Sequence, residues 1–291
     1  MNNKRRPPRS KNKKPQQTRT QKVRNPSKSV AEPGNLHSTD SLNGERIQKV
    51  LARGGMASRR EIERWIEDGK IVVNGGVIQP GYRLKPGDVV KVNGRIVKWE
   101  KYAVQPVRVL VYHKPEGEVV TRRDPEGRPV VFTQLPKLTV GRWIAVGRLD
   151  INTSGLLLVT NNGELANRLM HPSSEIDREY AVRILGDVDE AMIERLKTGV
   201  ELDDGMARFN DIQFHSGEDG ANKWFYVVVM EGRNRLVRRL WESQGVKVSR
   251  LKRVRYGPAM LPERIKQRSY YELDERELAH LMDYVGLEQP K

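Results

Sequence analysis

The order of apolar segments after residue 106 most constrains the fold. Residues 106–287 contain six segments with the composition of β-strands, namely "RVLVYHKP", "RWIAVGRLD", "GLLLVT", "REYAVRIL", "KWFYVVVM" and "SYYEL". Helical patterns occur in "NNGELANRLMHP", in "DEAMIERLKTG" and over residues 274–285, where Asp274 and Glu277 have capping-box spacing. Strands and crossover-length helices do not alternate regularly. The order therefore predicts an α+β domain with a mixed, largely antiparallel sheet.

Residues 43–103 predict a separate small domain. "IQKVLARGG" has an apolar face of helical period and ends at paired glycines. "SRREIERWIEDG" predicts a second helix, in which Ser58 and Glu61 form a capping box. The two short strands "KIVVNGG" and "GDVVKVNGR" follow, each with an Asn-Gly turn signal.

Residues 1–42 predict a disordered basic arm. They contain eleven Lys or Arg against two acidic residues, which accounts for +9 of the formal net charge of +16. Five prolines and few large apolar residues oppose a core. The arm either attracts phosphates without reading sequence or is a solubilising tail.

Composition narrows the partners and excludes several kinds of site. The charge predicts a polyanionic partner, with nucleic acid ahead of an anionic membrane surface. No apolar run is long enough to span a bilayer and no apolar signal segment follows the basic N-terminus, so a cytoplasmic protein is expected. The chain has no cysteine, and its five histidines lack ligand spacing, so neither disulfides nor a dedicated metal site is expected.

The stretch "GRLDINTSGLLLVT" holds the main candidate for chemistry. A strand is expected to end at Arg148-Leu149-Asp150, and a polar loop leads to the next strand at Leu156. Active-site residues often follow rigid strands, but an aspartate there is also a common turn former or cap. The pattern alone leaves both roles of Asp150 open.

Two parts of the chain resemble known families. The stretch "SRREIERWIEDGKIVVNGG" resembles the small RNA-binding domain of the S-four type. "GRLDINTSGLLLVTNNGELANRLMHP" resembles the signature of the pseudouridine synthases that include the RsuA and RluB enzymes, and "YHKPEG", "REYAV" and "EGRNRLVRRLWESQG" resemble further motifs of that family in the expected order. "DPEGRPVVF" and the last of these motifs resemble the RluB-like branch. That branch acts on large-subunit ribosomal RNA, with an accessible uridine in a stem-loop as the implied substrate.

The second resemblance implies site residues. Asp150 would be the catalytic carboxylate, attacking the sugar, attacking the base or removing a sugar proton. Tyr180 would stack on the uracil and take part in proton transfer. Arg238 would keep Asp150 ionised and oriented. Val237 would pack on the flipped base and Arg148 would fill the gap that the base leaves. No cofactor is implied.

RNA-contact residues are implied in both domains. In the first domain the resemblance indicates Arg59, Arg60 and Lys70, which could otherwise be a solvated helix face. In the second, the candidates are Lys114, Arg178 and the basic stretch 233–255, including Arg233, Arg239 and Arg253. Arg235-Leu236 departs from the His-Gln pair that often stands at those two positions, so no role is assigned to either residue.

Other functions remain open at this point. The chain could act on small-subunit ribosomal RNA or transfer RNA, or it could be a non-catalytic ribosome-associated RNA-binding protein. A metal-dependent nuclease would use Asp203 and Asp204, or Asp187 and Asp189, but these pairs lie beside glycine turns or at a helix start, where turn and cap roles are expected. A monomer is expected from the resemblance.

Overall fold

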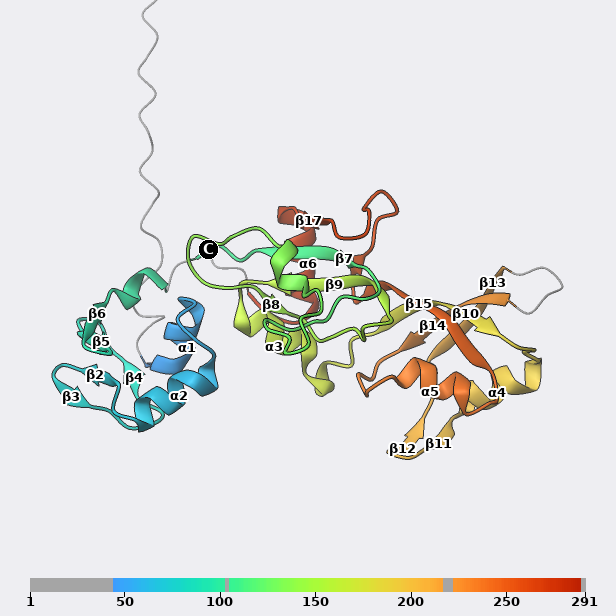
Figure 1. Ribbon diagram of the computed structural model, residues 1–291, viewed down its shortest axis with the longest axis horizontal. Helices are drawn as coiled ribbons and strands as arrows, with labels where there is room; N and C mark the ends of the chain where they lie inside the picture. Colours follow the sequence, from blue (N-terminus) through green and yellow to red (C-terminus); the bar gives the residue numbers. More distant parts are fainter. Residues whose placement is uncertain (1–43, 103–104, 217–221, 289–291) are drawn as a thin grey trace, which may run out of the picture. The chain divides into compact units, whose positions relative to one another are not determined.

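A computed structural model describes residues 44–102, 105–216 and 222–288 of the chain (Figure 1). The expected basic arm, residues 1–42, lies outside the described residues.

The first described segment folds as two helices beside a small antiparallel sheet. The four main strands run in the order β3-β2-β5-β6. At the Asn74-Gly75 turn both residues have positive φ, 52° and 83°, as an Asn-Gly hairpin turn requires. The elements are β1 (Glu45–Arg46), α1 (Ile47–Arg53), α2 (Arg59–Glu67), β2 (Ile71–Val73), β3 (Gly76–Val77), β4 (Arg83–Leu84), β5 (Val90–Val92), β6 (Arg95–Val97) and the 3-10 helix η2 (Trp99–Tyr102).

The expected helices of this segment are confirmed, with one difference at the second helix start. Ser58 caps α2 by accepting a hydrogen bond from the Glu61 backbone N–H at 3.1 Å. The Glu61 carboxylate instead accepts from the Trp65 indole at 3.0 Å. The cap therefore lacks the reciprocal bond of a full capping box.

The second segment is built on a nine-stranded mixed sheet, which confirms the α+β expectation. Its main path runs β13-β14-β10-β15-β9-β7-β17, and β15 with β9 is the parallel pair among antiparallel neighbours. The strands are β7 (Val109–Lys114), β8 (Ile144–Ala145), β9 (Ser154–Thr160), β10 (Arg178–Leu185), β13 (Asp211–Ser216), β14 (Asn222–Val229), β15 (Lys247–Tyr256), β16 (Ala259–Met260) and β17 (Tyr270–Glu272). The hairpin β11 (Val200–Leu202) with β12 (Gly205–Ala207) is separate from this sheet.

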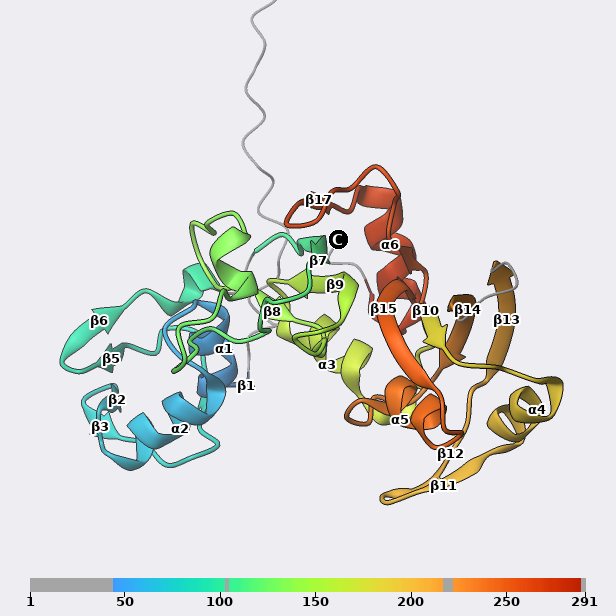
Figure 2. The same ribbon diagram turned by 45° about the vertical axis from the view of Figure 1, so that its right-hand side comes forward.

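Helices cover the two halves of the sheet separately (Figures 1 and 2). Residues of α3 (Gly163–Met170) and α6 (Glu275–Tyr284) pack in one core with alternate residues of β7 and β9. Those of α4 (Glu190–Thr198) and α5 (Leu236–Glu242) pack in another with alternate residues of β10 and β14. The capping box at Asp274 and Glu277 is present. The remaining elements are the 3-10 helices η3 (Val131–Gln134) and η4 (Pro172–Ser174). Every helix in the described ranges is too short or too polar to cross a bilayer.

The expected strand ending at Asp150 is the main correction to the sequence-based fold. The strand β8 ends at Ala145, and residues 146–153 form no strand. Gly147 adopts a φ of +75°, which is incompatible with a continuing strand. Asp150 therefore lies in a loop before β9, where the Thr153 backbone N–H closes a turn onto the Asp150 carbonyl at 3.0 Å.

Candidate active site

A cavity of about 430 Å³ gathers most of the predicted site residues. Asp150 and Arg148 enter it from the loop before β9, Tyr180 from β10 and Val237 from the first turn of α5. Arg178, Arg233 and Arg253 also line it. Glu231 and Tyr256 also line it. The fold thus places two carboxylates, two phenols, several apolar side chains and several guanidinium groups around a single space. Such a concave site with converging polar groups suits a small planar ligand such as a base.

The loop that carries Asp150 is held by hydrogen bonds from the buried side chain of Lys114. This side chain is fully buried, with 0% exposure, at the end of β7. Its Nζ donates to the carbonyl oxygens of Pro115, Asp150 and Thr153 at 2.9, 3.0 and 2.8 Å. Burial lowers the pKa of Lys114 to about 8, against the opposing effect of nearby acidic groups that include Asp150. Lys114 therefore fixes the backbone of Asp150.

Arg238 holds the same loop from the other side. Its Nη1 donates to the Val248 carbonyl at 3.0 Å and its Nη2 to the Asn152 carbonyl at 2.8 Å. Burial lowers the pKa of Arg238, as does the positive charge of Arg235, while Asp150 opposes the shift. Within the described residues no ion pair joins Arg238 to Asp150, so the guanidinium acts here on the Asp150 loop through backbone bonds and through its charge.

Two predicted RNA contacts are wrong because the side chains are buried. The Lys114 side chain is fully buried and donates its hydrogen bonds to three backbone carbonyl groups. Arg253 is 2% exposed, donates Nε to the Leu156 carbonyl at 2.8 Å and lies over the Tyr256 ring. Arg253 borders the cavity from inside the protein. Neither cation can be a surface contact to the RNA backbone.

Other predicted contacts have partners within the protein. Arg178 donates to the Met230 carbonyl at 2.6 Å. Arg233 and Arg239 both pair with Asp204 in the β11–β12 turn, at 3.0 and 2.8 Å. Hydrogen bonding to Arg239 lowers the pKa of Asp204, so this carboxylate is held ionised by arginines. Arg148 lies exposed at the cavity.

The nuclease alternative loses its candidate ligands. Asp204 is the ion-pair partner just described, and Asp189 caps α4 by accepting from the Met192 backbone at 2.7 Å. Within residues 44–102, 105–216 and 222–288, no group of three or more His, Asp or Glu side chains is arranged to hold a metal ion.

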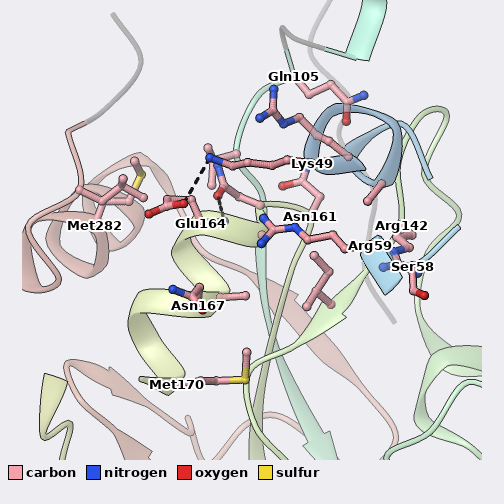
Figure 3. Close-up of a pocket in the computed structure, with 18 of the residues that line it drawn as sticks. Lys49, Ser58, Arg59, Gln105, Arg142, Asn161, Glu164, Asn167, Met170 and Met282 are labelled. Carbon is pink, nitrogen blue, oxygen red and sulfur yellow. Dashed lines mark hydrogen bonds and ion pairs between the residues drawn. The ribbon is translucent and has the colours of Figure 1, made fainter. Parts of the chain in front are cut away.

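A second cavity of about 650 Å³ contains two of the three predicted contacts of the first segment. Arg59 and Arg60 are among its lining residues. Figure 3 shows Arg59 together with Lys49 and Arg142 at this cavity. Lys49 forms an ion pair with Glu164 across the cavity at 3.4 Å. Burial lowers the pKa of Arg142, and the charge of Arg59 lowers it further. The cavity therefore concentrates positive charge.

The third predicted contact of the first segment, Lys70, lies outside this cavity and pairs with Asp68 at 2.7 Å.

A buried acid, Glu118, lies behind the active-site loop and was not predicted from the sequence. Glu118 is 1% exposed, accepts a hydrogen bond from the Tyr112 hydroxyl at 2.6 Å and pairs with Arg268 at 3.3 Å. Its negative charge opposes the lowering of the Lys114 pKa. A glutamate within "PEGEVV" reads as a surface residue, so only the fold reveals its burial.

Comparisons with known proteins show the family of the chain. Residues 108–243 match the family described as RNA pseudouridylate synthase, and residues 45–90 match the S4 domain. The structure is similar to one described as "Crystal structure of pseudouridylate synthase", with a TM-score of 0.57 at 22% identity over 81% of this chain and 99% of that one. This likeness concerns the fold alone.

Curated relatives are much more similar. The "Ribosomal large subunit pseudouridine synthase B" of Pseudomonas aeruginosa is 59% identical over 84% of this chain, which spans 63% of that protein. The proteins of the same name from Pasteurella multocida and Escherichia coli (strain K12) are each 54% identical over 84% of this chain, covering 72% and 84% of their lengths.

The chain therefore belongs to the RNA pseudouridine synthase family, a class of isomerases. Within that family it is of the RsuA/RluB type, with an S4 domain ahead of the synthase domain.

Proposed function

We propose that this protein converts a specific uridine of large-subunit (23S) ribosomal RNA to pseudouridine, with Asp150 as the catalytic carboxylate acting on a flipped-out base. The observation that carries the proposal is the shared cavity of Asp150, Tyr180 and Val237. The printed names of the similar curated proteins support the large subunit as the source of the substrate.

The reaction needs little beyond these side chains. The bond from the ribose anomeric carbon to nitrogen 1 of uracil breaks, the base turns, and a bond to carbon 5 forms. Carbon 5 loses a proton and nitrogen 1 gains one, so the overall change is an isomerisation without a cofactor. An ionised Asp150 can attack the sugar, attack the base or accept a sugar proton. Tyr180 offers a ring for stacking and a hydroxyl for proton transfer.

The surrounding guanidinium groups fit a base that has left its stack. Unstacking costs a few kcal/mol, and less in a loop. Arg148, which is exposed at the cavity, can occupy the gap in the RNA. Arg178 and Arg233 border the same cavity and would attract the flanking phosphates. Val237 would contact the face of the base.

The test uses Asp150→Asn, which keeps the shape of the side chain and removes its charge. Pseudouridine would be mapped in both ribosomal RNAs from cells that lack the protein and are rescued with each form. Asp203→Asn is the matched control, because Asp203 is exposed in the β11–β12 turn and does not line the cavity. We expect one large-subunit site to disappear and to return with wild type and the control only.

Other results would change the proposal in defined ways. A small-subunit or transfer RNA site would overturn the large-subunit assignment and keep the reaction. Full rescue by Asp150→Asn would overturn the role of Asp150 and favour another catalytic group. An unchanged map would favour a non-catalytic RNA-binding protein. We propose further that the protein acts as a monomer in the cytoplasm on a stem-loop with an accessible uridine.

A further inference from the structure

The sheet formed by β13, β14, β10 and β15 has two very different faces. Val182 and Ile184 on β10 and Phe225 and Val227 on β14 are buried in the core that also contains residues of α4 and α5. Figure 1 shows these two helices on the same side of the strands. Because neighbouring residues of a strand point to opposite faces, the residues between them point away from these helices.

The cross-strand register shows which side chains share that other face. One row across the strands is Gln213, Tyr226, Ala181 and Lys252. The next row is Ser216, Trp224, Arg183 and Arg250. Residues paired across an antiparallel ladder lie on the same side of the sheet, so the two rows are adjacent. None of these eight side chains is buried. We call the surface formed by His215, Trp224, Tyr226, Arg183, Arg250 and Lys252 the basic aromatic face.

Its aromatic side chains surround a hollow. The His215 ring packs edge-on against Tyr226, with centroids 4.9 Å apart and planes at 69°. A depression of about 230 Å³ is lined by these two residues together with Ala181 and Trp224. The Arg183 guanidinium lies 6.0 Å from the Trp224 ring centroid. Flat ring surfaces are therefore accessible at the bottom of a shallow site.

Its cations have no acidic partner in the part of the chain that the structure describes. No described carboxylate oxygen lies within 4.0 Å of the charged nitrogens of Arg183, Arg250 or Lys252. Arg183 instead donates Nε to the Ser249 hydroxyl at 2.9 Å. Like charges on neighbouring strands disfavour one another, and an anionic ligand would offset this repulsion.

We propose that the basic aromatic face binds single-stranded RNA, with bases stacked on Trp224 and Tyr226 and phosphates contacted by Arg183, Arg250 and Lys252. Every base has a face that can stack, so such a surface holds single strands with little sequence preference. A polyanion is favoured over a protein partner because three cations gather on this face without an acidic partner among the described residues. Tyr180 precedes Ala181 on β10 and points to the opposite face, so this site is separate from the Asp150 cavity.

The inference rests on the proposed function for the source of the RNA. The ligand is a single-stranded segment of the same ribosomal RNA, held while the reacting uridine occupies the other face of the sheet.

The test measures binding of the full-length chain to a fluorescein-labelled dodecamer of cytidine, which contains no uridine for the Asp150 cavity. The variants are Trp224→Ala, Tyr226→Ala and the double variant Arg250→Glu/Lys252→Glu. Phe214→Ala is the aromatic control, because Phe214 is 58% exposed and packs edge-on against the buried Phe225. Arg195→Glu, exposed on α4, is the charge control.

We expect each aromatic variant to weaken binding about fivefold or more, and both controls to stay within twofold of wild type. The double charge variant should also reduce the slope of log K against log salt by about 1.4, since each phosphate contact to a single strand contributes about 0.7. Equal binding by wild type and all three variants would overturn the proposal, as would binding lost equally in the controls.

A second measurement keeps the proposal testable if a variant does not fold. Ultraviolet cross-linking of the wild-type chain to the same dodecamer should give adducts within residues 223–229 of β14. Adducts confined to other segments would overturn the proposal.

Failure of this inference can be told apart from failure of the proposed function. Conversion of a short stem-loop with the target uridine should be unchanged in Trp224→Ala and Tyr226→Ala, because neither residue lines the Asp150 cavity. If the wild-type protein converts no ribosomal uridine, but the variants still bind the dodecamer more weakly than wild type, the proposed function alone is refuted. If the wild-type protein converts the uridine and the variants bind the dodecamer as tightly as wild type, this inference alone is refuted.

Discussion

Lys114 offers the sharpest test of how the fold positions Asp150. Its ammonium group is fully buried and donates to three carbonyl oxygens, two of which belong to Asp150 and Thr153 in the active-site loop. Replacing Lys114 with methionine keeps a side chain of similar length and removes all three donors. The Asp150 carbonyl then keeps only its bond from the Thr153 backbone N–H, and the Pro115 and Thr153 carbonyls lose the bond from Lys114. The loop is no longer tied to the end of β7 and can move relative to the cavity.

The expected loss of stability follows from two opposing effects. Hydrogen bonds from a charged donor contribute about 1.5–3 kcal/mol each, so three contribute roughly 4.5–9 kcal/mol. Against this, burial lowers the pKa of Lys114 to about 8 from its ordinary value. At 1.36 kcal/mol per pKa unit, keeping the buried charge costs about 3 kcal/mol. The Lys114→Met variant should therefore lose roughly 1.5–6 kcal/mol of unfolding free energy at pH 7.

The pH dependence gives a check that a simple packing defect would not show. The native pKa of about 8 lies below the unfolded value of about 10.4, so between them the unfolded chain binds more protons at this site. Stability from Lys114 therefore rises as pH increases through that window, by up to about 3 kcal/mol. Urea unfolding of both proteins from pH 7 to 10.5 measures this difference. A difference that is flat or falls with pH would refute the reasoning.

Activity provides the second readout. A displacement of about 1 Å at a catalytic group can cost about 10²-fold in rate, so kcat should fall by at least tenfold while KM changes little. Single-turnover conversion of a stem-loop substrate measures this. A folded Lys114→Met variant with a kcat within threefold of wild type would show that the lysine does not position Asp150.

Three further predictions concern the start of β9, the arginine that holds the Asp150 loop, and the N-terminal cap of α6. Gly155→Ala should destabilise the protein by more than about 2 kcal/mol in urea unfolding, because Gly155 has a φ of +108° and an added Cβ would lie 2.2 Å from the Arg253 carbonyl; an unchanged midpoint would contradict this. Arg238→Lys should lower kcat by about tenfold or more, since an ammonium group cannot reproduce the paired bonds to the Val248 and Asn152 carbonyls; a loss confined to KM would argue against a positioning role. Asp274→Ala should cost about 1 kcal/mol of stability through the lost cap of α6, with conversion unaffected at temperatures below unfolding; reduced conversion by the folded protein would show a further role.

The strands and helices of the second segment were largely predictable because their signals are local. The apolar run of β9, the proline after α3 and the capping pair at Asp274 act over a few residues. The prediction of a strand up to Asp150 was wrong because the apolar residues before Asp150 are buried in two different hydrophobic cores. Val146 is buried in the core with α3, and Leu149 in the core with Trp143. A conformation at Gly147 with positive φ makes this possible, and no alternation pattern reveals it.

The sequence by itself determined the α+β class and an S4-type segment ahead of the synthase segment, because these depend on local periodicity and on residue identities in order. Its resemblance to a known family proposed Asp150, Tyr180 and Arg238 as site residues. Tertiary structure alone decided which charges are available. Lys114 and Arg253 look like surface cations in the sequence, yet the fold buries both against backbone carbonyls. Trp224 and Arg183 look like ordinary strand residues, yet strand pairing brings them onto one accessible face. Burial and cross-strand neighbours depend on segments far apart in the chain, so no local pattern specifies them.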